Sequence, residues 1–349
     1  MRTARVSTQV RTAVTPPPDG HRPALRVAFG LAVPGSALLA AGHPALIVYA
    51  VFGAITGMYG RHEPTGRRII HQSQAAVMLL SGVGIGAALS HTRSAPAILV
   101  SAAVMFATLG SILTDLLNLE PQGPFYGIVA LGAVATIPPS YASPALAIGI
   151  CLATSLLCIL LGVIDSHRNA IDTGSRLSKP PKTPKTPIDR IGIHALRYGL
   201  AVALAGTIGL LMGLDHANWA MAAAAGPLAA ADARARLCRG VQRLIGNAIG
   251  LVVAAILLMP EPAEYVLAIA LMALLFPTEL FMSHNHAVAL GFFTPLIMVM
   301  AALSVPTEPS NLLVARGIDT LLGVAVALSI VVMVRGAPTE GARITPGPA

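Results

Sequence analysis

The chain has 349 residues, of which 55% are hydrophobic and 11% charged, with a mean hydropathy of +0.73. Soluble domains carry about 25% charged residues, so this composition excludes a water-soluble globule. A net charge of +8 is common in nucleic-acid-binding proteins, but the distribution of the basic residues along this chain, described below, excludes that class.

Apolar stretches of about 20 residues, the length that crosses a hydrocarbon core, follow one another along the chain. Runs such as residues 145–164 show no alternation of polar and apolar residues, which excludes a β-barrel. Hydropathy therefore predicts an all-α, polytopic membrane protein with about twelve transmembrane helices. The predicted spans are 24–41, 44–59, 73–90, 95–117, 124–141 and 143–164 in the first half, and 192–213, 217–231, 241–259, 264–282, 286–305 and 311–334 in the second.

These spans group into two blocks, 24–164 and 191–335, each predicted to hold six helices. Residues 1–23 and 336–349 are predicted to be disordered. Residues 165–190 are rich in Pro and Lys and predict an extended, solvated tether. A cleaved signal peptide is the alternative for the first span. A near copy of this stretch, beginning with the same ALR, recurs from residue 195, and an internal copy cannot be a leader.

The basic residues predict the orientation of the spans. If the N-terminus is cytoplasmic and the spans alternate, only Arg93 and Arg316 of the 23 Lys and Arg residues lie outside. Both termini are then cytoplasmic. The basic excess is explained by topology and by attraction to anionic lipids of the inner leaflet, and not by nucleic acid.

The two halves repeat each other. His43 corresponds to His216, and residues 114–116 (TDL) correspond to 278–280 (TEL). Because each half has an even number of spans, the copies share one orientation and form a parallel repeat.

A second repeat is nested in the second half. Residues 243–250 read RLIGNAIG and open span 9, and residues 316–323 read RGIDTLLG and open span 12. Three spans separate the two phrases, and an odd number reverses the orientation. Spans 7–9 and 10–12 are therefore predicted to be an inverted pair.

On a helix, positions i, i+3, i+4 and i+7 share one face. That face carries Arg243, Gly246, Asn247 and Gly250 on one span, and Arg316, Asp319, Thr320 and Gly323 on the other. Small residues at this spacing let helices approach closely, so both faces are expected to contact protein. The two arginines then point along seams between helices.

Two interpretations of each arginine remain open. Arg243 either extends to anionic lipid at a cytoplasmic helix end or attracts an anion. Arg316 either pairs with Asp319 within its helix or supplies a fixed charge at the mouth of an anion route. Asn247, Thr320 and Thr294 are the polar candidates beside them.

The carboxylates within the predicted spans are candidates for proton coupling. Glu279 ends span 10 and Asp115 is its counterpart on span 4, and Asp319 lies beside Arg316. The alternative for Glu279 and Asp115 is pairing with loop arginines near the inner interface. Trp219 is expected to be an interfacial anchor, and Pro227 and Pro295 are expected to break spans 8 and 11.

No motif indicates a cofactor, a metal or ATP. Cys151, Cys158 and Cys238 form no CxxC pair, and the sequence has no GxxxxGK[ST] phosphate-binding loop. His284 and His286 would diverge on a helix, so a metal site is not predicted. The chain is therefore predicted not to be an enzyme, and no cofactor is expected.

The second half resembles the fusaric acid resistance (FUSC-like) family, which includes bacterial aromatic acid exporters and is related to the plant aluminium-activated malate transporters. The residues that carry the resemblance are HANWA from His216, RGVQRLIGNAIG from Arg239, TEL from Thr278, NHAVAL from Asn285, FTP from Phe293 and RGIDTLLG from Arg316.

The resemblance implies a multi-pass, dimeric exporter or channel for organic anions, and we expect it to lie in a bacterial plasma membrane. The large cytoplasmic domain of many family members is missing, which argues against a periplasmic adaptor partner. Span 6 has no arginine where span 12 has Arg316, so the first half is predicted to be a scaffold.

Three functions follow. The first is export of small, aromatic carboxylates, driven by protons. The second is a passive anion channel on the same fold. The third is a membrane scaffold or envelope-assembly subunit in which each arginine is structural.

Overall fold

The computed structural model describes residues 20–61, 63–173, 188–214, 216–230, 233–305 and 307–334. Over these residues the chain forms twelve α-helices and two short 3-10 turns, with no β-strand, which confirms the all-α prediction. The first half contains α2 (His21–Ala40), η1 (Pro44–Leu46), α3 (Ile47–Ile55), η2 (Thr56–Met58), α4 (Thr65–His91), α5 (Pro96–Leu117), α6 (Phe125–Ala135) and α7 (Pro144–Thr173). The second half contains α8 (Ile188–Leu211), α9 (Ala217–Leu228), α10 (Ala233–Leu258), α11 (Glu264–Met282), α12 (His286–Ser304) and α13 (Pro309–Met333).

Within the described ranges, nine helices are long and apolar enough to cross a membrane: α2, α4, α5, α7, α8, α10, α11, α12 and α13. Large apolar side chains such as Leu160, Val252 and Ile256 are exposed on the outside of the bundle. A surface of this kind is stable in lipid and would aggregate in water. The chain is therefore a multi-pass membrane protein, as the hydropathy predicts.

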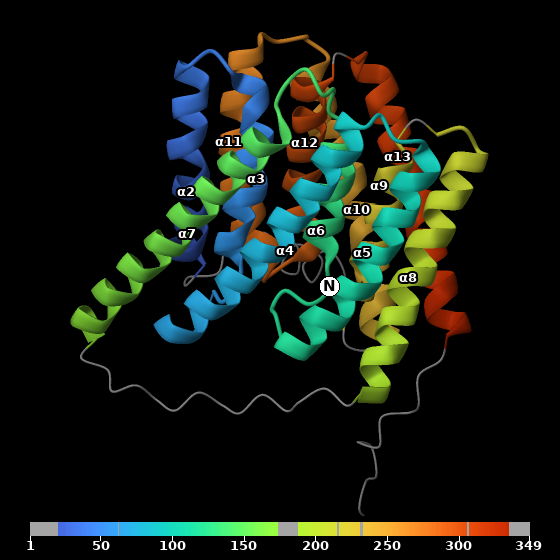
Figure 1. The fold of residues 1–349 in the computed structure, drawn as a ribbon, viewed down its shortest axis with the longest axis horizontal. Helices are drawn as coiled ribbons and strands as arrows, with labels where there is room; N and C mark the ends of the chain where they lie inside the picture. The colour runs from blue at the N-terminus through green and yellow to red at the C-terminus, as the bar shows by residue number, and fades with distance from the viewer. Residues whose placement is uncertain are drawn as a thin grey trace, which may run out of the picture.

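Every third helix lies inside the bundle. All residues of α3 and α9 are buried, and α6 and α12 are buried over most of their lengths. These helices are apolar around their whole circumference, as a helix surrounded by protein must be. Three of them are short, because a buried helix need not match the thickness of the membrane. The centre of the molecule is thus built from α3, α6, α9 and α12 (Figure 1).

Corresponding helices pack together in the two halves. In the first half α4 packs on α6 and α7, and α7 packs on α3. In the second half α10 packs on α12 and α13, and α13 packs on α9. Contacts of α2 with α11 and of α5 with α8 join the halves. A repeat requires that equivalent helices make equivalent contacts, and the contacts above have this pattern. The parallel repeat and the nested inverted pair stay predictions.

The ends of several helices differ from the predicted span limits. α4 begins at Thr65 and α10 at Ala233, each eight residues before its predicted span. The first turns of these helices contain basic residues, which lower the mean hydropathy, so hydropathy does not include them in a span. α7 continues to Thr173 and α8 begins at Ile188, so both ends of the predicted tether are helical. The remaining tether and most of the predicted disordered ends lie outside the described residues.

The two prolines expected to break spans behave differently. α9 ends at Leu228, directly after Pro227. α12 continues for nine residues beyond Pro295, so the predicted break in span 11 is wrong. Neighbouring helices surround α12 at this level, and packed neighbours are what allow a membrane helix to contain proline.

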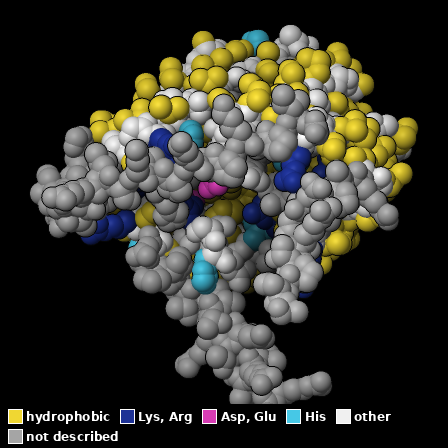
Figure 2. Space-filling view, turned by 90° about the horizontal axis from the view of Figure 1, so that it is seen from below, with side chains coloured by type: hydrophobic (Ala, Val, Ile, Leu, Met, Phe, Trp, Pro, Cys, Tyr) yellow, Lys and Arg dark blue, Asp and Glu magenta, His cyan; other side chains and the backbone are white. Residues whose placement is uncertain are grey.

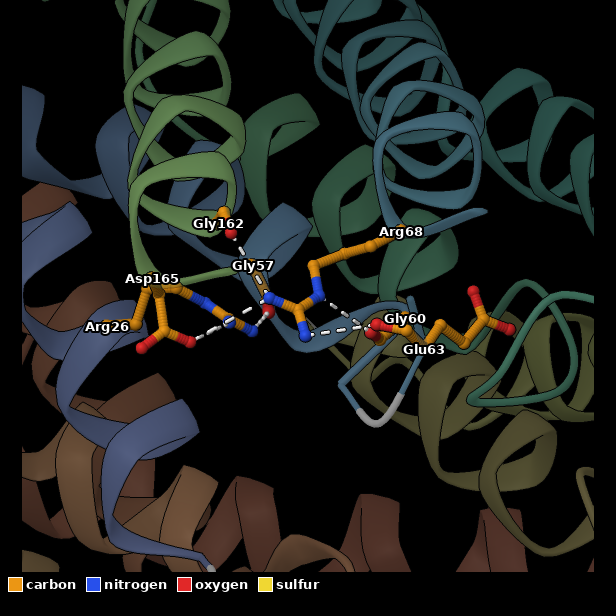
Figure 3. Close-up of polar contacts among 7 residues, drawn as sticks. All are labelled: Arg26, Gly57, Gly60, Glu63, Arg68, Gly162 and Asp165. Carbon is orange, nitrogen blue, oxygen red and sulfur yellow. Dashed lines mark hydrogen bonds and ion pairs between the residues drawn. The ribbon is translucent and has the colours of Figure 1, made fainter. Parts of the chain in front are cut away.

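We call the face at which α7 ends and α8 begins the lower face, at the bottom of Figure 1, and the opposite face the upper face. An ion cluster closes the first half at the lower face. Asp165 of α7 contacts Arg26 of α2 at 3.3 Å and Arg68 of α4 at 3.8 Å (Figure 3). Arg68 also donates hydrogen bonds to the carbonyl oxygens of Gly60 and Gly162. These contacts tie three helices together without a bound group.

Candidate functional site

Arg243 and Arg316 lie well inside their helices. Arg243 is ten residues from the start of α10 at the lower face, and Arg316 is seven residues from the start of α13 at the upper face. At 1.5 Å per residue these depths are about 15 Å and about 10 Å. Their exposed fractions are 2% and 3%. The interpretation that Arg243 extends to lipid is therefore wrong, because its helix begins earlier than hydropathy indicates.

The small residues of the two arginine-bearing faces hold the neighbouring helices close. A Cβ added at Gly250 of α10 would lie 2.6 Å from Thr294 Cβ of α12, and one at Gly323 of α13 would lie 2.5 Å from Ala223 Cβ of α9. Only glycine allows such an approach. Both faces therefore contact protein, as their spacing predicts. Each arginine side chain consequently lies next to an inner helix.

Both guanidinium groups lie over aromatic rings. The Cζ of Arg243 is 5.0 Å from the ring centre of Phe125, and that of Arg316 is 5.4 Å from the ring centre of Trp219. These are cation–π distances. The Nε atoms of both arginines and Nη1 of Arg243 have no hydrogen-bond partner among the described residues. The two charges also repel each other.

Asp319 does not pair with Arg316. It is 1% exposed, and neither of its carboxylate oxygens accepts a hydrogen bond from a described residue. Arg316 and Asp319 therefore form no direct ion contact, although their opposite charges still attract each other across one helical turn. The hydroxyl of Thr320 also has no partner in the described chain, whereas the hydroxyl of Thr294 donates to Asn247 Oδ1 at 3.1 Å.

Two vestibules open at opposite faces of the inner helices. The lower vestibule has a volume of about 490 Å³ and contains Arg61, Glu63, Glu120 and Arg239 in its walls. Figure 2, a view of the lower face, shows basic side chains and an acidic patch around a central hollow. The upper vestibule has a volume of about 280 Å³ and a mostly apolar lining.

A small void lies between the vestibules. It is lined by Arg316, Phe293 and Trp219 among others, and its volume of about 10 Å³ is near the minimum for one water molecule. Ala133, Trp219 and Ile297 line both this void and the upper vestibule. The void is therefore the inward continuation of the upper vestibule, and Arg316 lines the void but not the vestibule.

Aromatic rings close the route below the void. Phe293 lies 6.1 Å from both Phe125 and Tyr126, and those two rings lie 5.1 Å from each other. The face of the Phe125 ring in turn contacts the Arg243 guanidinium, and Arg239, one helical turn earlier on α10, lines the lower vestibule. From bottom to top, the order is lower vestibule, Arg243, aromatic cluster, Arg316 void and upper vestibule.

Glu279 and Asp115 both have partners. Glu279 is completely buried and forms an ion pair with Arg61, which also donates to Ser283 Oγ at 2.8 Å. This is the pairing with a loop arginine that the sequence left open. Asp115 contacts His194 Nδ1 at 2.8 Å instead. Neither carboxylate contacts Arg243 or Arg316, so the structure does not bring the coupling candidates of the sequence into one site.

Sequence reasoning missed part of this site. Trp219 is 6% exposed and lines the void, so its interpretation as an interfacial anchor is wrong. Phe125, Tyr126 and Arg61 were not singled out. The signal that was present is an aromatic pair at the start of a short, fully apolar span, in a chain with only 4% aromatic residues. The described residues contain no cluster of His, Cys, Asp or Glu that would hold a metal.

Residues 203–330 match the family described as fusaric acid resistance protein-like, which confirms the resemblance seen in the sequence. The Uncharacterized membrane protein YvaC of Bacillus subtilis (strain 168) is 26% identical over 137 residues, which are 39% of this chain and 22% of that protein. The chain thus spans less than a quarter of the relative it matches. No solved structure matches it significantly. The relationship to aluminium-activated malate transporters stays a prediction.

Proposed function

We propose that the chain is a secondary transporter that exports small, organic carboxylate anions between its inner helices. The observation that carries this proposal is the position of two buried guanidinium groups, Arg243 and Arg316, between vestibules that open at opposite faces. An anion entering from below would meet first one positive charge and then the other. The transporter-like family of the second half supports the same function.

Arg243 gives the strongest reason to expect an anion. It forms no ion pair with a carboxylate of the described chain, and two of its donor nitrogens have no partner. A buried, unpaired charge costs several kcal/mol. In contrast, Arg26 and Arg68, which are also buried, share Asp165. A chain that needed Arg243 only for packing would be more stable with an apolar residue there, so a buried arginine at this position favours a visiting negative partner.

The closed route favours a carrier over an open channel. The void between the vestibules has room for about one water molecule, and an aromatic cluster separates it from Arg243. An organic acid passes only if these walls move, as alternating access requires. A passive anion channel is the second candidate, and the transport experiment below separates the two.

Asp319 is the residue we favour for proton coupling. It is buried one helical turn from Arg316, and its two oxygens have no hydrogen-bond partner among the described residues. Protonation of Asp319 would leave the positive charge of Arg316 uncompensated and so favour an anion beside it. Glu279 and Asp115 are weaker candidates, because Arg61 and His194 already stabilise them.

We place the lower face in the bacterial cytoplasm, because the basic residues gather there and are retained on that side of the plasma membrane. They would also attract anionic lipids. Since the proposed route lies within one chain, transport does not depend on the dimer that the family resemblance implies.

The experiment is transport of labelled 4-hydroxybenzoate in proteoliposomes with and without an imposed pH gradient. A proton-driven carrier moves the label uphill. Arg243→Gln and Arg316→Gln are each expected to lower the initial rate about tenfold or more, since each removes roughly 1.4 kcal/mol or more of attraction for the anion. Arg234→Gln is the matched control, because Arg234 is exposed on the same helix as Arg243.

The outcomes separate the three functions. Current that reverses at the equilibrium potential of the anion and ignores the pH gradient would identify a channel. Unchanged flux in both Arg243→Gln and Arg316→Gln would overturn the anion route. No flux of any organic acid by the folded, unmodified protein would leave the scaffold function.

A further inference from the structure

The upper vestibule differs from the lower one in its chemistry. Its wall includes the apolar side chains of Val48, Ile297, Met300 and Leu312, and no Lys, Arg, Asp or Glu of the described residues lines it. Its volume of about 280 Å³ approaches the lower limit of small-molecule pockets, which are mostly apolar with a few polar groups. It is large enough for one six-membered ring and too apolar to favour a hydrated inorganic anion.

The hydroxyl groups of this vestibule are not available to hold a carboxylate. Thr136, Ser304 and Thr307 each donate their proton to a backbone carbonyl oxygen, at 2.8, 2.8 and 3.3 Å. They therefore present only acceptor oxygens to a ligand. A carboxylate in the vestibule would meet no donor from these three hydroxyl groups, whereas Arg316 offers a full positive charge in the adjoining void.

Arg316 is the nearest cation along the same route. It lies in the void that shares Ala133, Trp219 and Ile297 with the vestibule. The indole of Trp219 lies against the Arg316 guanidinium at 5.4 Å and stacks on the His216 ring at 4.4 Å with an interplanar angle of 17°. Trp219 is therefore the wall between the apolar vestibule and the charged void in this closed state.

We propose that the upper vestibule is the binding pocket for the apolar, ring-sized body of the carboxylate whose charged end binds Arg316, with Trp219 as the side chain that separates the two parts when the site is empty. This inference rests on the proposed function and adds where the body of the substrate binds. A ligand that fills both parts displaces the indole from Arg316 and replaces a cation–π contact with an ion pair. The site then favours carboxylates that carry a ring over acetate.

The chain offers a direct probe, because Trp219 is its only tryptophan. The full-length protein in lipid nanodiscs is titrated with benzoate, cyclohexanecarboxylate and acetate while tryptophan fluorescence is recorded. Benzoate and cyclohexanecarboxylate are expected to give saturable changes, with acetate at least about tenfold weaker, as burial of a six-carbon ring implies. Arg316→Gln is expected to weaken benzoate binding by a similar factor.

Two variants fill the pocket and one is a matched control. Ala301→Phe places a ring in the vestibule from α12, and Thr136→Phe does so at its exposed rim, where a larger side chain is tolerated. Both are expected to remove the benzoate response. Ala153→Phe, on the exposed surface of α7, is expected to leave it unchanged.

The inference is overturned if benzoate and acetate act alike, or if the folded Thr136→Phe protein responds as the unmodified protein does. Its failure is distinct from that of the proposed function. Transport that depends on Arg316, without any change in Trp219 fluorescence on titration, would refute the binding pocket but not the proposed function. A saturable, ring-dependent response without transport would refute the transporter alone.

Discussion

The contact of α13 with α9 at Gly323 determines where Arg316 lies, and Gly323→Ala tests it. The added Cβ would lie 2.5 Å from Ala223 Cβ and 2.8 Å from the backbone nitrogen of Ala224, and it would also contact the carbonyl oxygen of Ala220. Carbon atoms pack at about 3.5–4.0 Å, so the two helices must separate by about 1 Å. Overpacking of this kind costs about 1–3 kcal/mol, partly offset by a gain of up to about 1 kcal/mol from replacing glycine in a helix.

Gly317→Ala is the matched control on the same helix. Its Cβ would lie 3.7 Å from Leu251 Cδ1, an ordinary contact, so only the helical gain remains. We expect Gly323→Ala to be about 2 kcal/mol less stable than Gly317→Ala, which lowers its thermal midpoint by about 3 °C relative to that control. Differential scanning fluorimetry of both variants in the same detergent measures this. Equal midpoints for the two variants would refute the close packing of α13 on α9.

Three further predictions concern the lower half of the route and its coupling. Gly226→Ala is expected to lower transport about tenfold, because its Cβ would lie 2.5 Å from Arg243 Nη1 and displace the guanidinium, as kinetics in proteoliposomes would show. Arg61→Gln is expected to destabilise the protein by about 3 kcal/mol, because it leaves Glu279 buried without its partner, and thermal denaturation measures the loss. Asp319→Asn is expected to abolish uphill accumulation while preserving downhill flux, which a comparison with and without a pH gradient would reveal.

Each of these predictions has its own control and contrary result. Gly149→Ala adds a Cβ that meets nothing within 4 Å, and it should transport normally. A Gly226→Ala protein as active as Gly149→Ala would place Arg243 outside the route. Arg67→Gln removes a partly exposed charge six residues from Arg61 that forms no ion pair with a described residue, and it should not change the midpoint. Restored stability in an Arg61→Gln, Glu279→Gln double variant would confirm the pair, whereas a further loss would contradict it. Asp319→Asn that still concentrates substrate would end its coupling role.

The sequence predicted the architecture well where composition decides it. Helices with one lipid-facing side, such as α5 and α11, were located to within a few residues, because apolar length alone defines them. The prediction missed the first turns of α4 and α10, because the charged residues there keep the hydropathy below the threshold for a span. This error matters for function, since it placed Arg243 at a membrane surface although it lies about 15 Å inside its helix.

The site was predicted in part. The spacing of Arg243 with Gly246 and Gly250 identified the face that packs on α12, because a helix fixes which residues share a side. Which aromatic ring meets each guanidinium depends on helices far apart in the chain, and periodicity carries no information about that. Phe125 and Trp219 therefore emerged only from the packing of α6 and α9 against α10 and α13.

The most direct test of the anion route is the charge preference of a cysteine placed within it. Ala222 lines the void beside Arg316, and Ala222→Cys can be made in a protein whose three native cysteines are replaced. Its reaction rates with negatively and positively charged methanethiosulfonates are compared, each corrected for intrinsic reactivity. We expect the negative reagent to react about tenfold faster, and this preference to disappear when Arg316 is changed to Gln. Equal rates for the two reagents, or a preference that survives the loss of Arg316, would contradict the account.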